Sequence, residues 1–358
     1  MSRQRQMKIL AAMSGGVDSN VAALLLKNEG HELIGATMKL YDNETAGIRT
    51  KTCCSLDDTE DARSVARRLG FPYYVFNFED DFRAQVIDRF IRAYEEGRTP
   101  NPCIDCNRYM KFGGLYRRAQ VLGCEAVATG HYARIAFEDG RYLLKKGLDR
   151  GKDQSYVLAY LTQEQLAHTR FPLGGLHKDE VRRLAEENGF FNAHKPDSQD
   201  ICFVPDGDYA GFIARTTGND CPPGDFVLDD GTVVGRHKGV THYTIGQRRG
   251  LGIAWSHSLF VKKIDPETNR VILSDDDGLF SRELDACDFN WIRWDVPPKT
   301  FRASARIRYR HAEQPAEVSL RDDGTVHIVF DEPQRAVTPG QTAVLYDGDT
   351  VLGGGTIL

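Results

Sequence analysis

Short apolar runs and helical periodicities alternate along the first half of the chain. Between the runs, apolar residues recur every three or four positions, as they do on one face of an amphipathic helix. Strands that alternate with helices predict a parallel sheet covered on both faces, in a Rossmann-like α/β domain. The runs of strand length are 8–13, 33–38, 73–76 and 126–129, and the expected helices are 17–29, 55–69, 82–95, 108–122 and 178–188.

The pattern changes from about Gly224 to the C-terminus. Short strand-like segments follow one another there, with turns such as Asp230-Gly231 and Asp323-Gly324, and helical periodicity does not return. This pattern predicts two small all-β domains, the last of them a β-barrel. The expected domains are an α/β domain over 1–208, a central β domain over 209–278 and a barrel over 279–358.

Composition narrows the possible partners. The 358 residues carry 46 Lys and Arg against 51 Asp and Glu, a formal charge of −5, so an RNA site would have to be a local basic patch. No run approaches the ~20 apolar residues of a membrane span, so we expect a cytoplasmic protein with no membrane partner. In that compartment the eight cysteines are expected to include catalytic or metal-binding thiols rather than static disulfides.

The segment Ser14-Gly15-Gly16 lies between the first predicted strand and the first helix. Paired glycines allow a tight turn that directs backbone N–H groups and the positive helix end at one point, where a phosphate fits. A Walker loop would need a lysine where this chain has Val17-Asp18-Ser19, and the third glycine of a dinucleotide fingerprint is also absent. A glycine turn before a capped helix is the simpler alternative.

Two more segments should meet this turn at one edge of the sheet. Ligands of parallel sheets bind beyond the carboxyl ends of the strands. Met38 and Gly130-His131 each stand at such an end, although they are far apart in the sequence. We therefore expect one crevice, with an adenine ring near Met38 and Gly130.

The cysteines with an informative context lie in two places. The segment 101–107 holds two of them, and Pro102 predicts a loop there, with a helix only from about Arg108. Cys106 would then stand at the N-terminus of that helix, where the pKa of a thiol is lowered. Cys202 lies between two apolar residues, a context more typical of a small buried side chain.

Arginines alternate with smaller residues along the segment 302–310. In a strand these arginines would share one face about 6.6 Å apart, near the spacing of RNA phosphates. A solvated strand face is the alternative. Alternation would turn Arg308 and Tyr309 to opposite faces unless Tyr309 lies at a strand end.

These motifs occur together in a fixed order. The hexapeptide 14–19 alone resembles the pyrophosphate loop (PP-loop) of ATP pyrophosphatases. Together with Lys152-Asp153-Gln154, the segment 201–203, the run 243–252 and Arg306-Ile-Arg-Tyr309, it resembles the tRNA-specific 2-thiouridylases over nearly the whole chain. That family adenylates O2 of the wobble uridine (U34) of tRNA and transfers sulfur to C2, giving 2-thiouridine, AMP and diphosphate.

The resemblance implies a role for each matching residue. Asp18 would be catalytic and would orient Mg²⁺ or the loop. The implied ATP contacts are Ala12, Met13, Ser14, Gly15, Gly16, Val17, Asp18, Ser19, Met38 and Gly130, and those to the target base are Asn101, Pro102 and Cys103. The implied tRNA contacts are His131, Lys152, Asp153, Gln154, Arg308, Tyr309 and Gln341.

The resemblance also implies how sulfur is carried. Cys202 would hold a persulfide and Cys106 would be the partner nucleophile, leaving a Cys106–Cys202 disulfide for a reductant. Many family members have an aspartate where this chain has Cys103. Three converging thiols could instead hold a [4Fe-4S] cluster with one open iron, and this alternative stays open here.

The implied partners are tRNA and a sulfur donor. The tRNAs would be those that accept Lys, Glu and Gln, and the donor a cysteine desulfurase or a sulfur-carrier protein. Two other functions compete. A PP-loop synthetase acting on a small metabolite would not need two catalytic thiols, and an RNA-binding protein with a decayed ATP site would not keep the intact hexapeptide 14–19.

Overall fold

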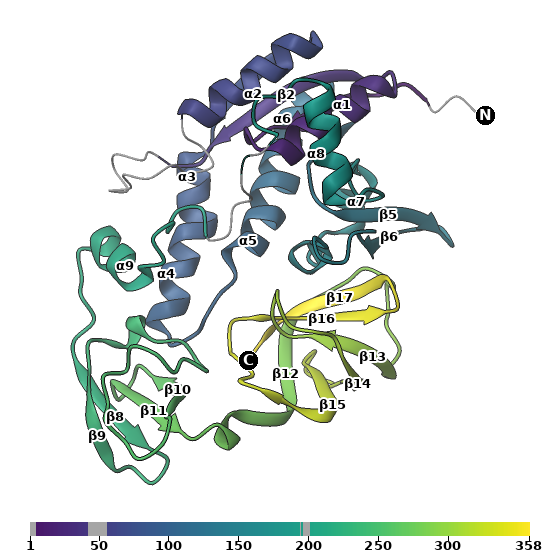
Figure 1. Cartoon of the computed structure of the whole chain (residues 1–358). Coiled ribbons are helices and arrows are strands. Elements are labelled where there is room, and N and C mark those ends of the chain that lie inside the picture. The colour runs from purple at the N-terminus through teal and green to yellow at the C-terminus, as the bar shows by residue number, and fades with distance from the viewer. Residues whose placement is uncertain (1–4, 42–55, 194, 196–200) are drawn as a thin grey trace.

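The computed structural model describes residues 5–41, 56–193, 195 and 201–358. Figure 1 shows an α/β part formed by the first half of the chain, followed by a small sheet and then a barrel. This order confirms the predicted fold class. The expected start of one helix at Ser55 lies outside the described residues.

The α/β part is built on five parallel strands in the order β3-β2-β1-β4-β7. The central strand β1 is buried on both sides because Ile9 and Ala11 pack in one apolar cluster and Leu10 in another. The strands are β1 (Lys8–Ala12), β2 (Glu32–Lys39), β3 (Tyr73–Asn77), β4 (Ala126–Ala128) and β7 (Thr169–Arg170). The first four were predicted from the sequence, and β7 was not.

Helices cover both faces of this sheet. The first cluster joins it to α1 (Val17–Asn28), α2 (Leu56–Leu69) and α8 (Lys178–Glu187). The second cluster joins it to α3 (Glu79–Phe82), the π-helix η1 (Arg83–Ile87), α4 (Asp88–Glu95), the π-helix η2 (Cys106–Gly114) and α6 (Leu115–Val121). Within the described ranges, no helix is long and apolar enough to cross a membrane.

The prediction of a loop over residues 101–107 is wrong, because the segment is helical from Pro102 onward. Helix α5 (Pro102–Asp105) continues directly into η2. Proline is well tolerated at the first helical position, where its missing N–H would have no partner in any case. Cys106 therefore lies inside the helical run, and the argument that a helix N-terminus lowers its pKa does not apply to it.

The second half of the chain is built from strands, but it opens on a helix. Helix α9 (Tyr209–Thr217) lies inside the predicted β domain and packs back on the second cluster of the α/β part. A four-stranded sheet then has the order β10-β11-β8-β9. Its strands are β8 (Gly224–Leu228), β9 (Val233–His237), β10 (Phe260–Asp265) and β11 (Arg270–Ser274).

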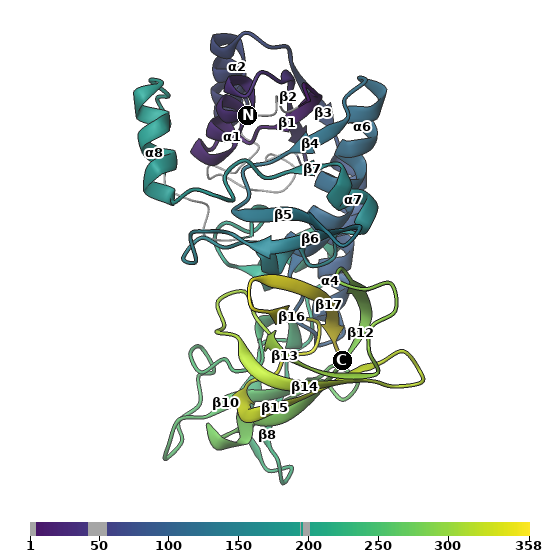
Figure 2. The same ribbon diagram turned by 90° about the vertical axis from the view of Figure 1, so that its right-hand side faces the viewer.

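Six strands close the C-terminal barrel, since β12 pairs with both β15 and β17. A hairpin of the α/β part extends the same sheet, through a pairing of Lys145 in β6 with Thr350 in β17 (Figure 2). The strands are β5 (Ala133–Glu138), β6 (Arg141–Lys146), β12 (Phe280–Trp291), β13 (Thr300–Arg306), β14 (Gln314–Leu320), β15 (Val326–Arg335), β16 (Thr342–Asp347) and β17 (Thr350–Ile357).

The predicted row of arginines is not formed. Strand β13 ends at Arg306, and residues 308–310 form a turn, so Tyr309 lies just beyond a strand end. Arg302 pairs with Asp331 at 2.6 Å, and Arg306 lies 3.6 Å from Asp153. Both guanidinium groups are thus engaged within the protein instead of forming an open basic face.

Candidate active site

The glycine loop connects β1 to α1 in a conformation that requires glycine. Gly15 has φ +74°, and a Cβ atom there would lie 2.3 Å from the carbonyl oxygen of Asp58. Ser19 Oγ accepts a hydrogen bond from Ser14 N at 3.2 Å and donates one to Gly16 O at 2.9 Å. Gly16 is the N-cap and offers no side chain to the first-turn N–H groups of α1. Those groups can therefore bind phosphate oxygens.

Asp18 is tied to a buried lysine. Lys178 Nζ lies 2.7 and 2.8 Å from the two carboxylate oxygens, and Tyr132 donates its hydroxyl to one of them at 2.8 Å. Lys178 is only 5% exposed, so its ammonium depends on this pairing. Asp18 thus joins the first turn of α1 to the start of α8, which fits the predicted role in orienting the loop, while its role toward Mg²⁺ stays a prediction.

The other predicted nucleotide contacts lie beside the loop. A Cβ atom on Gly130 would be 2.7 Å from the backbone carbon of Asp18, so the glycine allows β4 to approach the first turn of α1. Thr37 donates its hydroxyl to the carbonyl of Met13, which places the end of β2 and Met38 next to the loop. The strand-end rule therefore predicted this neighbourhood correctly.

Cys106 and Cys202 pack against the same apolar cluster. Both are half-buried on the face of the sheet that holds Phe90 and Phe203. The carbonyl of Cys202 accepts a hydrogen bond from the Tyr41 hydroxyl at 2.6 Å. Two cysteines from distant parts of the sequence thus border the same apolar cluster, and Tyr41 ties the backbone of Cys202 to the segment after β2.

Cys103 stands apart from that cluster. It is exposed, one turn earlier along the helical run, and it lies within electrostatic range of Tyr309 of the barrel. Across the described part of the chain, no group of three or more His, Cys, Asp or Glu side chains is placed to hold a metal ion. The predicted ligand set Cys103, Cys106 and Cys202 therefore does not fit a [4Fe-4S] cluster in this arrangement.

The segment before α5 is docked on the barrel. The Asn101 side chain accepts a hydrogen bond from Cys103 N at 3.2 Å and caps the helix. Two residues earlier, Thr99 N donates to Pro339 O at 2.9 Å, and Gln341 Nε2 donates to Thr99 O at 2.8 Å. Gln341 thus binds the protein backbone beside the residues predicted to contact the target base.

Most of the predicted tRNA residues gather at this junction, and several also have structural partners. Asp153 is buried and accepts from Gly147 N at 2.9 Å, and Gln154 Oε1 accepts from Tyr132 N at 3.0 Å. Arg308 donates to Thr338 Oγ1 at 3.0 Å. Burial lowers the pKa of the Arg308 guanidinium, and the nearby positive charge of Arg335 adds to this effect.

Tyr309 is the most open of these side chains, with 37% of its surface exposed. Burial of the remainder raises the pKa of its phenol, Arg306 opposes this, and Asp153, Cys103 and Lys152 are close enough to contribute. A phenol ring beside Cys103 and Lys152 can stack on a nucleobase at the point where the barrel meets α5.

His131, one of the predicted tRNA contacts, is buried. Its ring is 7% exposed between Phe112 and Phe171, with Nδ1 2.7 Å from Thr129 Oγ1. Burial holds the pKa of His131 well below its usual value, and the neighbouring Lys111 ammonium lowers it further. The imidazole is therefore neutral in this environment.

Two lysines near the glycine loop were not predicted from the sequence. Lys178 binds Asp18, and Lys195 binds Asp58 and Asp61, the first of which contacts Gly15. Neither lysine lies in a recognisable motif, and each meets its partner only through the folded chain. The signal available in the sequence was limited to Lys178 at the first position of a predicted helix.

Three family models match successive parts of the chain. The tRNA methyl transferase HUP domain matches residues 7–206, the tRNA methyl transferase PRC-barrel domain matches 210–275, and the aminomethyltransferase beta-barrel domain matches 281–357. Among solved structures, a 4-thiouridine synthetase–RNA complex with bound ATP is 20% identical, with a TM-score of 0.37 over 56% of this chain and 45% of that chain.

Curated relatives match over almost the full length. The tRNA-specific 2-thiouridylase MnmA of Clostridioides difficile is 49% identical over 98% of both chains. The enzyme of the same name from Moorella thermoacetica is 51% identical over 97% of this chain and 98% of the relative. Identity at this level, across all three parts of the fold, shows that this chain belongs to the MnmA family of tRNA-specific 2-thiouridylases.

Proposed function

We propose that this chain thiolates C2 of the wobble uridine (U34) of tRNA, with ATP activating O2 and a cysteine persulfide supplying the sulfur. Membership of the family supports the coarser activity, an ATP-dependent tRNA sulfurtransferase. One observation carries the finer mechanism. Cys106 and Cys202, far apart in sequence, pack on the same apolar cluster as Ala12 and Met38, which lie beside the glycine loop.

Activation of the base uses the glycine loop. The first-turn N–H groups of α1 and the hydroxyls of Ser14 and Ser19 bind the phosphates, and adenine lies near Met38 and Gly130. O2 of uridine attacks the α-phosphate, and pyrophosphate leaves as its developing charge is stabilised by these fixed donors. The Lys178–Asp18 pair keeps the first turn of α1 in place during this step.

Sulfur transfer then uses the two thiols. The terminal sulfur of a Cys202 persulfide attacks C2, and AMP leaves with the former O2. The Cys106 thiolate attacks Sγ of Cys202, the bond to the transferred sulfur breaks, and 2-thiouridine departs with the electron pair. A Cys106–Cys202 disulfide remains, which a dithiol reductant returns to two thiols before a cysteine desulfurase or sulfur carrier reloads Cys202.

The substrate would lie across the junction of α5 and the barrel. In this proposal the target base contacts Asn101, Pro102 and Cys103, and Lys152 and Tyr309 contact the tRNA directly. Asp153, Gln154 and Gln341 hold the backbone beneath those contacts. The expected substrates are tRNAs that accept Lys, Glu and Gln.

Mass spectrometry of tRNA nucleosides tests the proposal, after incubation with ATP and a persulfide donor. Cys106→Ser and Cys202→Ser should each abolish 2-thiouridine while tRNA-dependent pyrophosphate release from the adenylation step continues, because only sulfur transfer needs the thiols. Cys221→Ser, at a half-buried cysteine of the central domain, is the matched control. Normal thiolation by either serine variant would refute the two-thiol mechanism.

Cys103→Ser separates the persulfide mechanism from the iron–sulfur alternative. Cys103 is exposed and does not pack against the apolar cluster that borders Cys106 and Cys202. Serine keeps a small polar side chain at this proposed base contact, so the variant should still form 2-thiouridine, with at most a raised KM for tRNA. Loss of activity in this variant, together with absorption at about 400 nm in anaerobically purified wild-type protein, would favour the iron–sulfur mechanism instead.

A further inference from the structure

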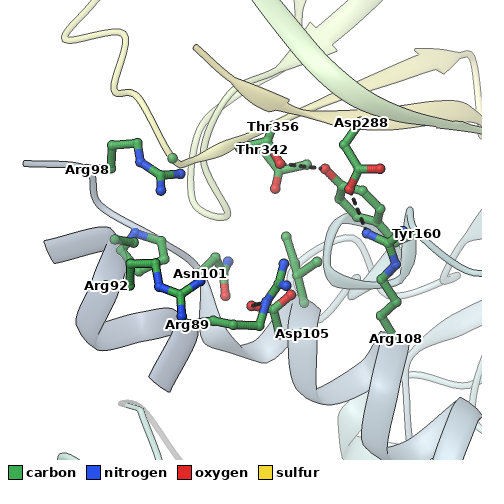
Figure 3. A pocket seen from close by; sticks show the side chains of 14 residues that line it. Arg89, Arg92, Arg98, Asn101, Asp105, Arg108, Tyr160, Asp288, Thr342 and Thr356 are labelled. Atoms are coloured by element: carbon green, nitrogen blue, oxygen red, sulfur yellow. Dashed lines mark hydrogen bonds and ion pairs between the residues drawn. The ribbon is translucent and has the colours of Figure 1, made fainter. Parts of the chain in front are cut away.

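A cavity of about 200 Å³ lies between helix α4, the start of α5 and the barrel (Figure 3). Its lining includes four guanidinium groups and two carboxylates, a surplus of two positive charges (4 − 2) in a chain whose formal charge is −5. The charged residues are Arg89, Arg92, Arg98, Arg108, Asp105 and Asp288.

Two of the arginines are held by the carboxylates. Arg108 lies 2.8 Å from Asp288 of β12, and Arg89 lies 3.3 Å from Asp105 of α5. Both guanidinium groups also stand over the ring of Tyr109, at 5.2 Å from its centroid. These pairs fix the walls of the cavity and neutralise its two acids.

The other two arginines supply the surplus charge. Arg92 lies one turn after Arg89 on α4, is exposed, and forms no side-chain hydrogen bond or ion pair with any described residue. Arg98 pairs with Glu96, but both side chains are at least 40% exposed, so this pair is weak and easily exchanged. In Figure 3 both guanidinium groups stand near Asn101, with Thr342 of the barrel across the cavity.

We propose that Arg92 and Arg98 bind a backbone phosphodiester of the RNA substrate in this cavity. Guanidinium groups bind phosphate oxygens through paired N–H donors, and the cavity is wide enough for one phosphate. RNA is the source because Asn101, the cap of α5 and a proposed target-base contact, lines the same cavity. A nucleotide whose base lies at Asn101 carries its own phosphate toward the two arginines. This inference rests on the proposed function.

Fluorescence anisotropy with an anticodon stem–loop tests the site. Arg92→Ala and Arg98→Ala should each weaken binding about five- to tenfold near 100 mM salt, and each should reduce the slope of log K against log salt by about one. Arg118→Ala, on the exposed face of α6 at the far end of the helical run, should change neither quantity. RNA affinity and salt slope equal to wild type in Arg92→Ala would overturn the proposal.

Replacing one charged phosphodiester of the RNA by a neutral linkage tests whether the anion bound by the two arginines is an RNA phosphate. A methylphosphonate beside the target nucleotide should weaken binding to the wild type, weaken it less in Arg92→Ala, and cause no further loss in the Arg92→Ala/Arg98→Ala double variant. Independent, additive losses would overturn the proposal, as would unchanged RNA affinity with weakened binding of inorganic pyrophosphate. If the losses of RNA affinity caused by the arginine substitutions and by the methylphosphonate are not additive, but the protein never forms 2-thiouridine, the phosphate site is supported and the proposed function is refuted.

Discussion

At the scale of single residues, the geometry of the glycine loop depends on one buried charge, the ammonium group of Lys178. A lysine ammonium as enclosed as that of Lys178 is tolerated because both oxygens of Asp18 accept its hydrogen bonds. The pair spans 160 positions of sequence and joins the start of α8 to the first turn of α1. It therefore positions the N–H groups that the phosphates would contact.

His131 should make the stability of the protein depend on pH. Because its pKa is lowered in the folded state, the unfolded chain takes up a proton near pH 6.5 while the folded chain does not. The stability that this buried neutral ring contributes is fully present above pH 6.5 and is lost as the pH falls toward the folded pKa. The slope is at most about 1.4 kcal/mol per pH unit.

Urea unfolding at pH 7.5 and pH 5.5 measures this effect. In His131→Gln the loss of unfolding free energy between the two pH values should be smaller than in the wild type by about 1 kcal/mol. His257→Gln replaces an exposed histidine and should leave the pH dependence unchanged. An identical loss in His131→Gln and the wild type would show that His131 titrates normally.

At the scale of elements, the start of α5 depends on one amide. Asn101 accepts the Cys103 N–H, so Asn101→Ala should lower the free energy of unfolding by about 1 kcal/mol. Asn101→Asp keeps the acceptor and should stay within a few tenths of a kcal/mol of the wild type. Urea unfolding of the three proteins checks this, and equal stability of the Ala and Asp variants would contradict the cap.

The same element shows where sequence prediction succeeds and fails. The parallel strands and the approach of Gly130 to the glycine loop were predictable because apolar periodicity and the strand-end rule are local signals. The residues around Pro102 were not, since a proline that excludes a helix interior also favours the first position of a helix. The prediction of a row of arginines over 302–310 was wrong because β13 ends at Arg306. The role of Lys178 was not predicted because its partner, Asp18, is brought to it only by the folding of the chain.

At the scale of the whole molecule, separate parts are joined where the substrate would lie. The β5–β6 hairpin of the α/β part extends the barrel sheet, and Lys146 of that hairpin lies 2.7 Å from Glu313 beyond β13. Arg306 of β13 reaches the buried Asp153, and Gln341 reaches Thr99. These contacts fix the position of Tyr309 relative to Asn101, so the RNA surface is set by docking between distant segments.

Gln341→Ala tests whether that docking matters. It removes the hydrogen bond to Thr99 O, next to Gly340, where a Cβ would lie 3.0 Å from Arg98 Cβ. We expect faster amide hydrogen exchange over residues 98–103 and weaker RNA binding, with exchange in β16 and β17 unchanged. Mass spectrometry of peptide fragments measures both regions.

Gln314→Ala is the matched control, because Gln314 is a half-buried glutamine of β14 whose side chain has no hydrogen bond to any described residue. Weaker RNA binding of Gln341→Ala without faster exchange would mean that Gln341 contacts the tRNA itself. Faster exchange without weaker binding would mean that the 98–103 segment is ordered by the RNA instead. Only the two effects together support docking of the barrel as the feature that presents Asn101 to the substrate.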